Sequence, residues 1–296
     1  MKRMDKTTLG LGAAIIAAFF FGASNPYAKI AASQTDPVLL SFLVTAIAAV
    51  IFGLYALLNP KHFTGLTSKN GDLYLCLGIF GHAIPSLLSL YGLTMTSALN
   101  LLFLLRTEIF FATIFGVLIY KEAITLKQIT GIIIGFLGVF LFATELKFTG
   151  VNLGDLLIIL ATVFWASYVV IVRKLSGTLQ PAAIASIRAW VALPFLGAAA
   201  LFLKTPITIP AAQYGNIGIF AISTYVFGVV AYNNAIERLG IWKAAIPAQL
   251  LSIIFGFIAT WIVLGETLSS IKIIGAAMIA LGTLLAVMKE NNNGKN

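Results

Sequence analysis

The sequence has little charge for its length. Only 10% of its 296 residues are Asp, Glu, Lys or Arg, whereas 60% are hydrophobic, and the mean hydropathy is +1.00. Soluble domains typically carry about 25% charged residues, and a soluble core cannot absorb this much apolar surface. Much of that surface must therefore face lipid, and the composition predicts an integral membrane protein.

Cysteine and histidine are too scarce for several kinds of chemistry. The single cysteine, Cys76, cannot form an intrachain disulfide. With only two histidines beside it, the sequence lacks the ligands of an ordinary zinc or di-iron site. There is no obvious Ser/His/Asp set, and no lysine lies at mid-depth, where a retinal Schiff base would need it. We therefore expect a protein that is not an enzyme and that holds no metal or cofactor.

The charges that are present are mostly basic, with 19 Lys and Arg against 10 Asp and Glu. They are scattered through short loops rather than gathered on one face, so we expect no nucleic-acid partner. Thirteen of the 19 lie at the termini or in loops on the same side, four lie on the opposite side, and Arg106 and Arg188 lie within the membrane. Since basic loops stay in the cytoplasm, this asymmetry predicts a cytoplasmic (inner) membrane protein with both termini in the cytoplasm.

Ten apolar runs are long enough to cross a bilayer, which takes roughly 17–25 residues. They lie at residues 8–28, 37–58, 73–92, 97–120, 126–143, 153–172, 181–203, 214–235, 243–264 and 271–288. The connections between them are too short to form a soluble domain. The first run follows MKRMDK and fits the pattern of a signal peptide, but it has a counterpart deep inside the chain. We therefore expect an all-α membrane protein of ten helices that keeps this first segment.

The chain matches itself when it is shifted by 144 residues. The most informative matched pairs are Pro37 and Pro181, Glu122 and Glu266, Gly131 and Gly275, and Gly138 and Gly282. These pairs predict two five-helix repeats, residues 8–145 and 153–288. Five is odd, so the second repeat must enter from the opposite side, an architecture that many alternating-access transporters use. We expect Glu122 and Glu266 to cap turns on opposite sides, and the glycines to allow close helix packing.

Taken together, these features resemble the EamA-type branch of the drug/metabolite transporter superfamily. The likeness rests on the two repeats, on the Gly265-Glu266 turn with the glycine stripe after it, and on Phe164-Trp165 opening the second repeat. It implies a carrier of small metabolites, often an exporter of amino acids, with a cavity between the repeats and peripheral fifth and tenth helices. In one departure, Val44 stands where family members often have an arginine, and Arg188 holds the matching place in the second repeat.

Charged residues within the predicted spans are the first candidates for substrate binding. A charge at membrane depth needs a partner or a water-filled cavity, and Arg106 and Glu108 lie near the middle of the fourth span. Two side chains that are two residues apart in a helix point in directions about 200° apart around its axis. We therefore expect at most one of them to face the substrate. Glu108, whose counterpart in the second repeat is Ser252, is placed to couple protons or to bind an ammonium group. The alternative is a structural role, either a buried ion pair with Arg188 or a polar contact with another helix.

Further candidates have a functional and a structural interpretation. His82, three residues before Pro85, is placed either to bind a carboxylate or relay protons, or to bond another helix. Arg188 would bind an anionic group or extend to the lipid headgroups. The remaining candidates would either contact a small organic substrate or pack between helices; they are Trp165, Tyr168, Tyr225, Tyr232 and Gln249.

The sequence thus predicts a secondary active transporter, in the export direction, for small metabolites such as amino acids. Protons are a candidate coupling ion, and the protein would act as a monomer or a homodimer. The alternative within the same class is a broad exporter of drugs and organic cations. A structural or sensory membrane protein is a weaker alternative, because an inverted repeat is typical of transporters.

Overall fold

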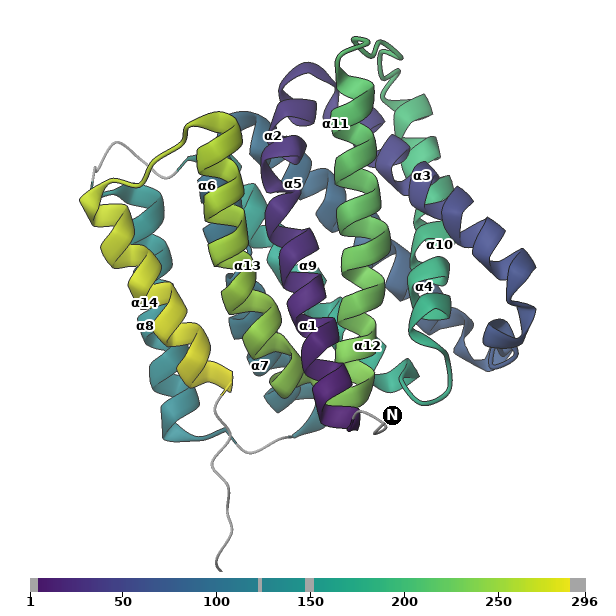
Figure 1. The fold of residues 1–296 in the computed structure, drawn as a ribbon, viewed down its shortest axis with the longest axis horizontal. Coiled ribbons are helices and arrows are strands. Elements are labelled where there is room, and N and C mark those ends of the chain that lie inside the picture. Colours follow the sequence, from purple (N-terminus) through teal and green to yellow (C-terminus); the bar gives the residue numbers. More distant parts are fainter. Residues whose placement is uncertain (1–4, 122–123, 147–151, 288–296) are drawn as a thin grey trace, which may run out of the picture.

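The structure is a computed structural model that describes residues 5–121, 124–146 and 152–287, and within them it is built of helices without a β-strand (Figure 1). The helices of the first half are α1 (Lys6–Ala23), α2 (Asn25–Gln34), α3 (Pro37–Leu58), η1 (Pro60–Phe63), η2 (Ser68–Asn70), α4 (Gly71–Gly78), η3 (Ile79–Ala83), α5 (Ile84–Met95), α6 (Ala98–Leu104), α7 (Thr107–Tyr120) and α8 (Leu126–Thr144). Those of the second half are α9 (Leu153–Leu175), α10 (Pro181–Phe202), α11 (Gln213–Phe220), η4 (Ala221–Gly228), α12 (Val229–Leu239), α13 (Ile241–Leu264) and α14 (Ser270–Val287).

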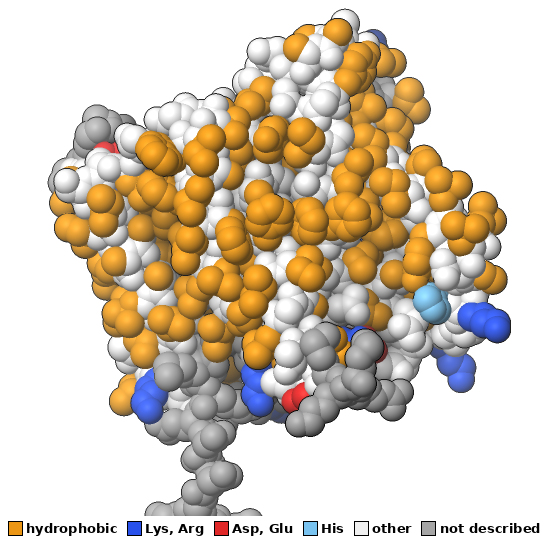
Figure 2. Space-filling model, viewed as in Figure 1, with side chains coloured by type: hydrophobic (Ala, Val, Ile, Leu, Met, Phe, Trp, Pro, Cys, Tyr) orange, Lys and Arg blue, Asp and Glu red, His pale blue; other side chains and the backbone are white. Residues whose placement is uncertain are grey.

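These helices form the membrane fold that the composition predicts. In the described ranges, nine continuous helical segments are long and apolar enough to cross a bilayer, and a tenth, Ser270–Ala286, is apolar but shorter. Hydrophobic side chains cover most of the face shown in Figure 2, and most of the Lys and Arg side chains seen there lie along the edge where α1 begins. The expectation of an all-α integral membrane protein is confirmed.

Several of the crossing segments are interrupted. The first is divided at Ser24, just before Pro26. The third contains the π-helical turn η3 just before Pro85, which cannot donate the backbone hydrogen bond of a regular helix. The eighth contains a longer π-helical stretch, η4, without a proline. Such wide turns are frequent at functional sites. The break at Ser24 and the stretch η4 line the central cavity described below, and η3 borders a small void behind its wall.

The two halves run in opposite directions. α1 begins at the end of the molecule at which α14 finishes (Figure 1). α9 begins beside the start of α14, because Asp155 in the first turn of α9 and Lys272 in the first turn of α14 both bond to Asn100. Helix contacts also repeat between the halves. α1 packs against α13 and α12, while α9 packs in the corresponding way against α7 and α5.

The glycine stripes meet where α8 packs against α14. A Cβ atom at Gly131 would lie 2.8 Å from the carbonyl oxygen of Gly282, and one at Gly138 would lie 2.9 Å from that of Gly275. Backbone atoms cannot give way as a flexible side chain can, so these positions need glycine for the observed approach. The predicted role of the glycines is confirmed. Of the two glutamates expected to cap turns, Glu122 lies outside the described residues.

Candidate substrate-binding cavity

A cavity of about 130 Å³ lies between the two halves. An apolar cavity of about 150 Å³ in another protein holds benzene, so this one has room for a small organic molecule. Its wall is shared by α1, α2, α5, α6 and α7 of the first half and by α9, α10, η4, α12 and α13 of the second, among others. α8 and α14 contribute none of the lining residues, so the pair packs at the periphery.

Six of the eight predicted site residues line this cavity. They are Arg106, Glu108, Trp165, Tyr168, Arg188 and Gln249. Tyr225 and Tyr232, the other aromatic candidates, line it as well. Ser252 and His82 do not, and each instead contacts a residue of the wall from behind.

Arg106 and Glu108 both line the cavity, although the prediction placed them about 200° apart on one helix. That prediction assumed one regular helix, whereas α6 ends at Leu104 and α7 begins at Thr107. Across the junction, the amides of residues 106, 108 and 109 each bond to the carbonyl three residues earlier rather than four. Such a tight turn advances about 120° per residue, which brings the two side chains nearer to one side.

The Arg106 side chain reaches across to α13. Its Nη1 donates to the carbonyl oxygen of Gln249 at 3.0 Å, to the side-chain oxygen of Gln249, and to Ser252 Oγ at 2.7 Å. Its Nε donates to the carbonyl oxygen of Leu102 at 3.1 Å. The side chain is 4% exposed. Arg106 therefore joins the two halves, and Ser252 belongs to this junction as a partner of Arg106.

Arg188 is held in a different way. It is 6% exposed, and its guanidinium carbon lies 4.5 Å from the ring centroid of Tyr168, a cation–π contact. The Tyr168 hydroxyl donates to Asn233 Oδ1 at 2.6 Å, which fixes the ring. Among the described residues, Arg188 Nε has no hydrogen-bond partner and no ion pair joins Arg188 to Glu108. Both structural alternatives for Arg188, extension to the headgroups and pairing with Glu108, therefore disagree with the structure.

His82 lies behind the cavity wall. Its Nε2 is 2.8 Å from Thr45 Oγ1, and its ring meets the Tyr225 ring edge-on with centroids 4.9 Å apart. It borders a second void of about 10 Å³, whose lining shares Arg188, Tyr225 and Val229 with the main cavity. The hydrogen bond to another helix, the structural interpretation of His82, is therefore what the structure shows.

Several wall residues were missed at the sequence level. Ser24 and Thr224 bond to each other at 2.7 Å across the cavity wall, linking the break between α1 and α2 to the π-helical stretch η4. Asn25 donates to the carbonyl oxygen of Ala98 at 2.7 Å. Small hydroxyl residues are ordinary in membrane helices, so only the Asn25-Pro26 break offered a signal for this part of the site.

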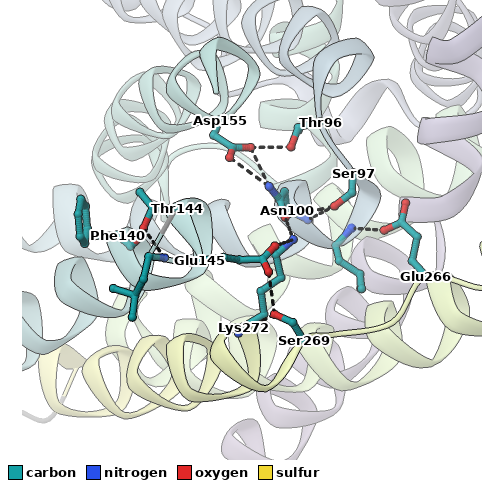
Figure 3. A network of polar contacts seen from close by, with 12 residues as sticks. Thr96, Ser97, Asn100, Phe140, Thr144, Glu145, Asp155, Glu266, Ser269 and Lys272 are labelled. Atoms are coloured by element: carbon teal, nitrogen blue, oxygen red, sulfur yellow. Dashed lines mark hydrogen bonds and ion pairs between the residues drawn. The ribbon is translucent and has the colours of Figure 1, made fainter. Parts of the chain in front are cut away.

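A second polar cluster lies where α6, α9 and α14 begin (Figure 3). We call it the α6 network, and it comprises Thr96, Asn100, Glu145, Asp155, Glu266 and Lys272. Asp155 accepts hydrogen bonds from Thr96 Oγ1 at 2.6 Å and from Asn100 Nδ2 at 3.1 Å. Lys272 donates to Asn100 Oδ1 at 2.9 Å and pairs with Glu145 at 3.3 Å.

Glu266 completes this network. Its carboxylate accepts from the backbone amides of Ala98 and Leu99 at 3.0 and 2.9 Å, so it caps the first turn of α6 in addition to lying in the predicted turn. In each of these contacts one partner belongs to the first half and the other to the second. The α6 network therefore joins the halves near one end of the molecule, as Arg106 does at its centre.

Apolar membrane-crossing helices in two oppositely directed halves, with a charged cavity between them, define a multi-pass membrane transport protein. A model described as the EamA-like transporter family matches residues 8–144 and 152–288. The chain belongs to this family, and the resemblance found in the sequence is confirmed.

Individual relatives agree with this membership. Over 294 residues the chain is 26% identical to "Uncharacterized transporter YyaM" of Bacillus subtilis, with 97% of this chain and 94% of that protein covered. Over 196 residues it is 26% identical to a protein of Salmonella typhimurium named "Probable amino-acid metabolite efflux pump", with 62% and 65% covered. A crystal structure of a protein 15% identical to this chain superposes on it with a TM-score of 0.66, over 95% of this chain and 96% of that one. The two proteins therefore share a fold.

Proposed function

We propose that the protein is a secondary active transporter that exports small amino-acid-like metabolites across the cytoplasmic membrane by alternating access. The observation that carries this proposal is the cavity between two oppositely directed halves, with Arg106, Glu108 and Arg188 in its wall. Charges at this depth cost a few kcal/mol or more unless they serve a polar pathway. A zwitterionic solute would complement groups of both signs.

The side chains that line the cavity favour a small solute with an ammonium group. Glu108 is placed to pair with that group, and it is also the candidate for exchanging a coupling proton. Trp165 and Tyr168 offer ring faces for an organic side chain. The relative from Salmonella carries the name of an amino-acid metabolite efflux pump, which supports the same class of solute.

Alternating access requires that each end of the cavity opens while the other is closed. Toward the end where α1 begins, the halves meet through buried apolar side chains, among them Ala14, Ala17, Ala235 and Ala244. Toward the other end they meet through the α6 network. With the basic side in the cytoplasm, the apolar contact would be the inner closure and the α6 network the outer one.

Transport into proteoliposomes tests this proposal. The purified chain is reconstituted, loaded with each of the 20 amino acids in turn, and assayed for counterflow of the radiolabelled amino acid without ATP. We expect saturable counterflow for at least one of them, together with a higher melting temperature in its presence. Glu108→Gln should abolish most of this counterflow in protein that is still folded. Absence of both counterflow and thermal shift across the panel would contradict the proposal.

A broad exporter of organic cations is the second candidate, because the aromatic wall and Glu108 suit a lipophilic cation. The two guanidinium groups oppose it, since they outnumber the single carboxylate at the same cavity. Counterflow of tetraphenylphosphonium in the same vesicles separates the candidates. Transport of this cation without transport of any amino acid would favour the second.

A further inference from the structure

We propose that Arg188, and not Arg106, binds the carboxylate of the transported solute. This inference rests on the proposed function and names the solute class: a small zwitterion with one carboxylate and one ammonium group. Both arginines line the cavity and both are almost fully buried. They differ in what their nitrogen atoms already bind, and this difference carries the assignment.

Arg106 is engaged by the protein. Its Nε and Nη1 make four contacts with oxygen atoms of Leu102, Gln249 and Ser252. A guanidinium has five N–H groups in a fixed plane, and most of those of Arg106 point at these acceptors. A solute carboxylate would have to displace protein acceptors, which would then be left buried without a donor.

Arg188 is held by its face rather than by its edge. Tyr168 covers one face of the guanidinium, whereas the N–H groups lie in the guanidinium plane and point outward from its edge. A cation–π contact therefore orients the group while leaving its donors available. This is the geometry in which a planar guanidinium receives a carboxylate through two parallel hydrogen bonds.

A small void lies behind Arg188. Arg188 and His82 both border this void of about 10 Å³, and Arg188 Nε and His82 Nδ1 have no partner among the described residues. Thr45 Oγ1 donates its proton to the carbonyl oxygen of Ser41, so it must accept from His82 Nε2–H, which leaves Nδ1 as an acceptor. One water fits such a void and would bridge Nε–H to Nδ1. His82 is thus a positioning residue, and the terminal nitrogens of Arg188 face the solute.

The size and charge of the site favour a carboxylate over a phosphate. Glu108 lines the same cavity, so a dianion bound at Arg188 would also meet a negative charge. A zwitterion meets a matching charge at each end. The volume of about 130 Å³ limits it to the size of an ordinary amino acid.

The first test changes the solute and leaves the protein intact. Binding of L-leucine, of L-leucinamide and of 4-methylpentanoate to the full wild-type chain is measured by calorimetry, and the acid–amide comparison is repeated with L-serine and L-phenylalanine. Since hydrogen bonds to charged groups are the strong ones, we expect each acid that binds to do so about 10- to 100-fold more tightly than its amide. Equal affinity of acid and amide would overturn the assignment to Arg188 while leaving the proposed function standing.

The second test changes the two arginines in parallel. Arg188→Gln should remove the preference for acid over amide, and Arg188→Lys should keep part of it, because lysine retains the charge but not the two parallel hydrogen bonds. In the matched control, Arg106→Gln, the protein should melt at a lower temperature yet keep the preference. A preference lost in Arg106→Gln and kept in Arg188→Gln would reverse the assignment. If no amino acid binds or is transported, the proposed function itself fails, which is a different result.

Discussion

The α6 network and the cavity are both polar clusters between the two halves, but they use their side chains differently. In the network, Asp155 accepts from two side chains, Lys272 has two partners and Glu266 accepts from two backbone amides. In the cavity, Arg188 is held through the face of its guanidinium by the Tyr168 ring. Matched groups hold the halves together, whereas a guanidinium held by its face keeps the donors of its edge for a ligand.

The internal repeat allows equivalent positions at the two ends of the molecule to be compared. Under the shift of 144 residues, Asp155 corresponds to Leu11 and Asn100 to Ala244. At these equivalent positions the side chains are apolar, and Ala244 packs in a buried apolar cluster with Ala14 and Ala17 of α1. A polar contact can exchange its partners for water when it opens, whereas an apolar contact must expose hydrophobic surface. The two repeats thus share a family fold but differ in the side chains at these equivalent positions.

The largest expected effect is on transport. Glu108→Gln removes the only carboxylate among the described residues that line the cavity without changing its shape, and we expect the initial rate of amino-acid counterflow to fall by about 100-fold. The melting temperature should change little, because Glu108 belongs to the cavity and not to the α6 network. Proteoliposome counterflow and thermal unfolding are measured on the same preparations. A wild-type rate would show that the carboxylate takes no part.

The matching change in the α6 network should act on stability. Asp155→Ala deprives Thr96 and Asn100 of their acceptor, which we expect to cost about 2–3 kcal/mol of unfolding free energy and to lower the melting temperature by several degrees. The acid–amide preference should stay at its wild-type value. Asp155→Asn is the control, since it keeps an acceptor and should lose less. A changed preference in Asp155→Ala would mean that the two regions are not separate.

A smaller effect is expected behind the cavity wall. His82→Ala removes the acceptor that would orient Arg188, and we expect the acid–amide preference to fall by about 5-fold, less than in Arg188→Gln. His82→Asn keeps an acceptor near the position of Nδ1 and should restore most of the preference. If both variants keep the full preference, His82 does not position Arg188.

The smallest effect is expected at the exposed edge of the network. The side chains of Lys272 and Glu145 are 16% and 24% exposed, and ion pairs in contact with solvent contribute about 0–1 kcal/mol. Glu145→Gln should therefore lower the melting temperature by about 2 °C or less in low salt. This difference should vanish at about 0.5 M NaCl, where charges are screened. A loss as large as that of Asp155→Ala would place Glu145 among the essential contacts of the network.

The sequence was informative where a pattern is local or repeated. Apolar runs predicted the crossing helices, and Gly131, Gly138, Gly275 and Gly282 predicted a contact that the structure contains. The charged and aromatic candidates inside these runs, together with Gln249, supplied eight of the 19 residues that line the cavity. The sequence did not reveal that Arg106 and Glu108 both line the cavity, because this depends on three backbone hydrogen bonds that span three residues instead of four, which no residue type indicates.

What the sequence by itself determined is the class of environment and the architecture. Apolar surface must lie in lipid and an odd number of helices inverts the second repeat. Only the tertiary structure decided which partner each buried polar residue contacts. Arg106 meets Gln249 of the other half, and Arg188 meets Tyr168 of the preceding helix, only because these helices pack together. The physical reason is that a buried charge is defined by its partners, and partners 143 residues away along the chain become neighbours only when the helices assemble.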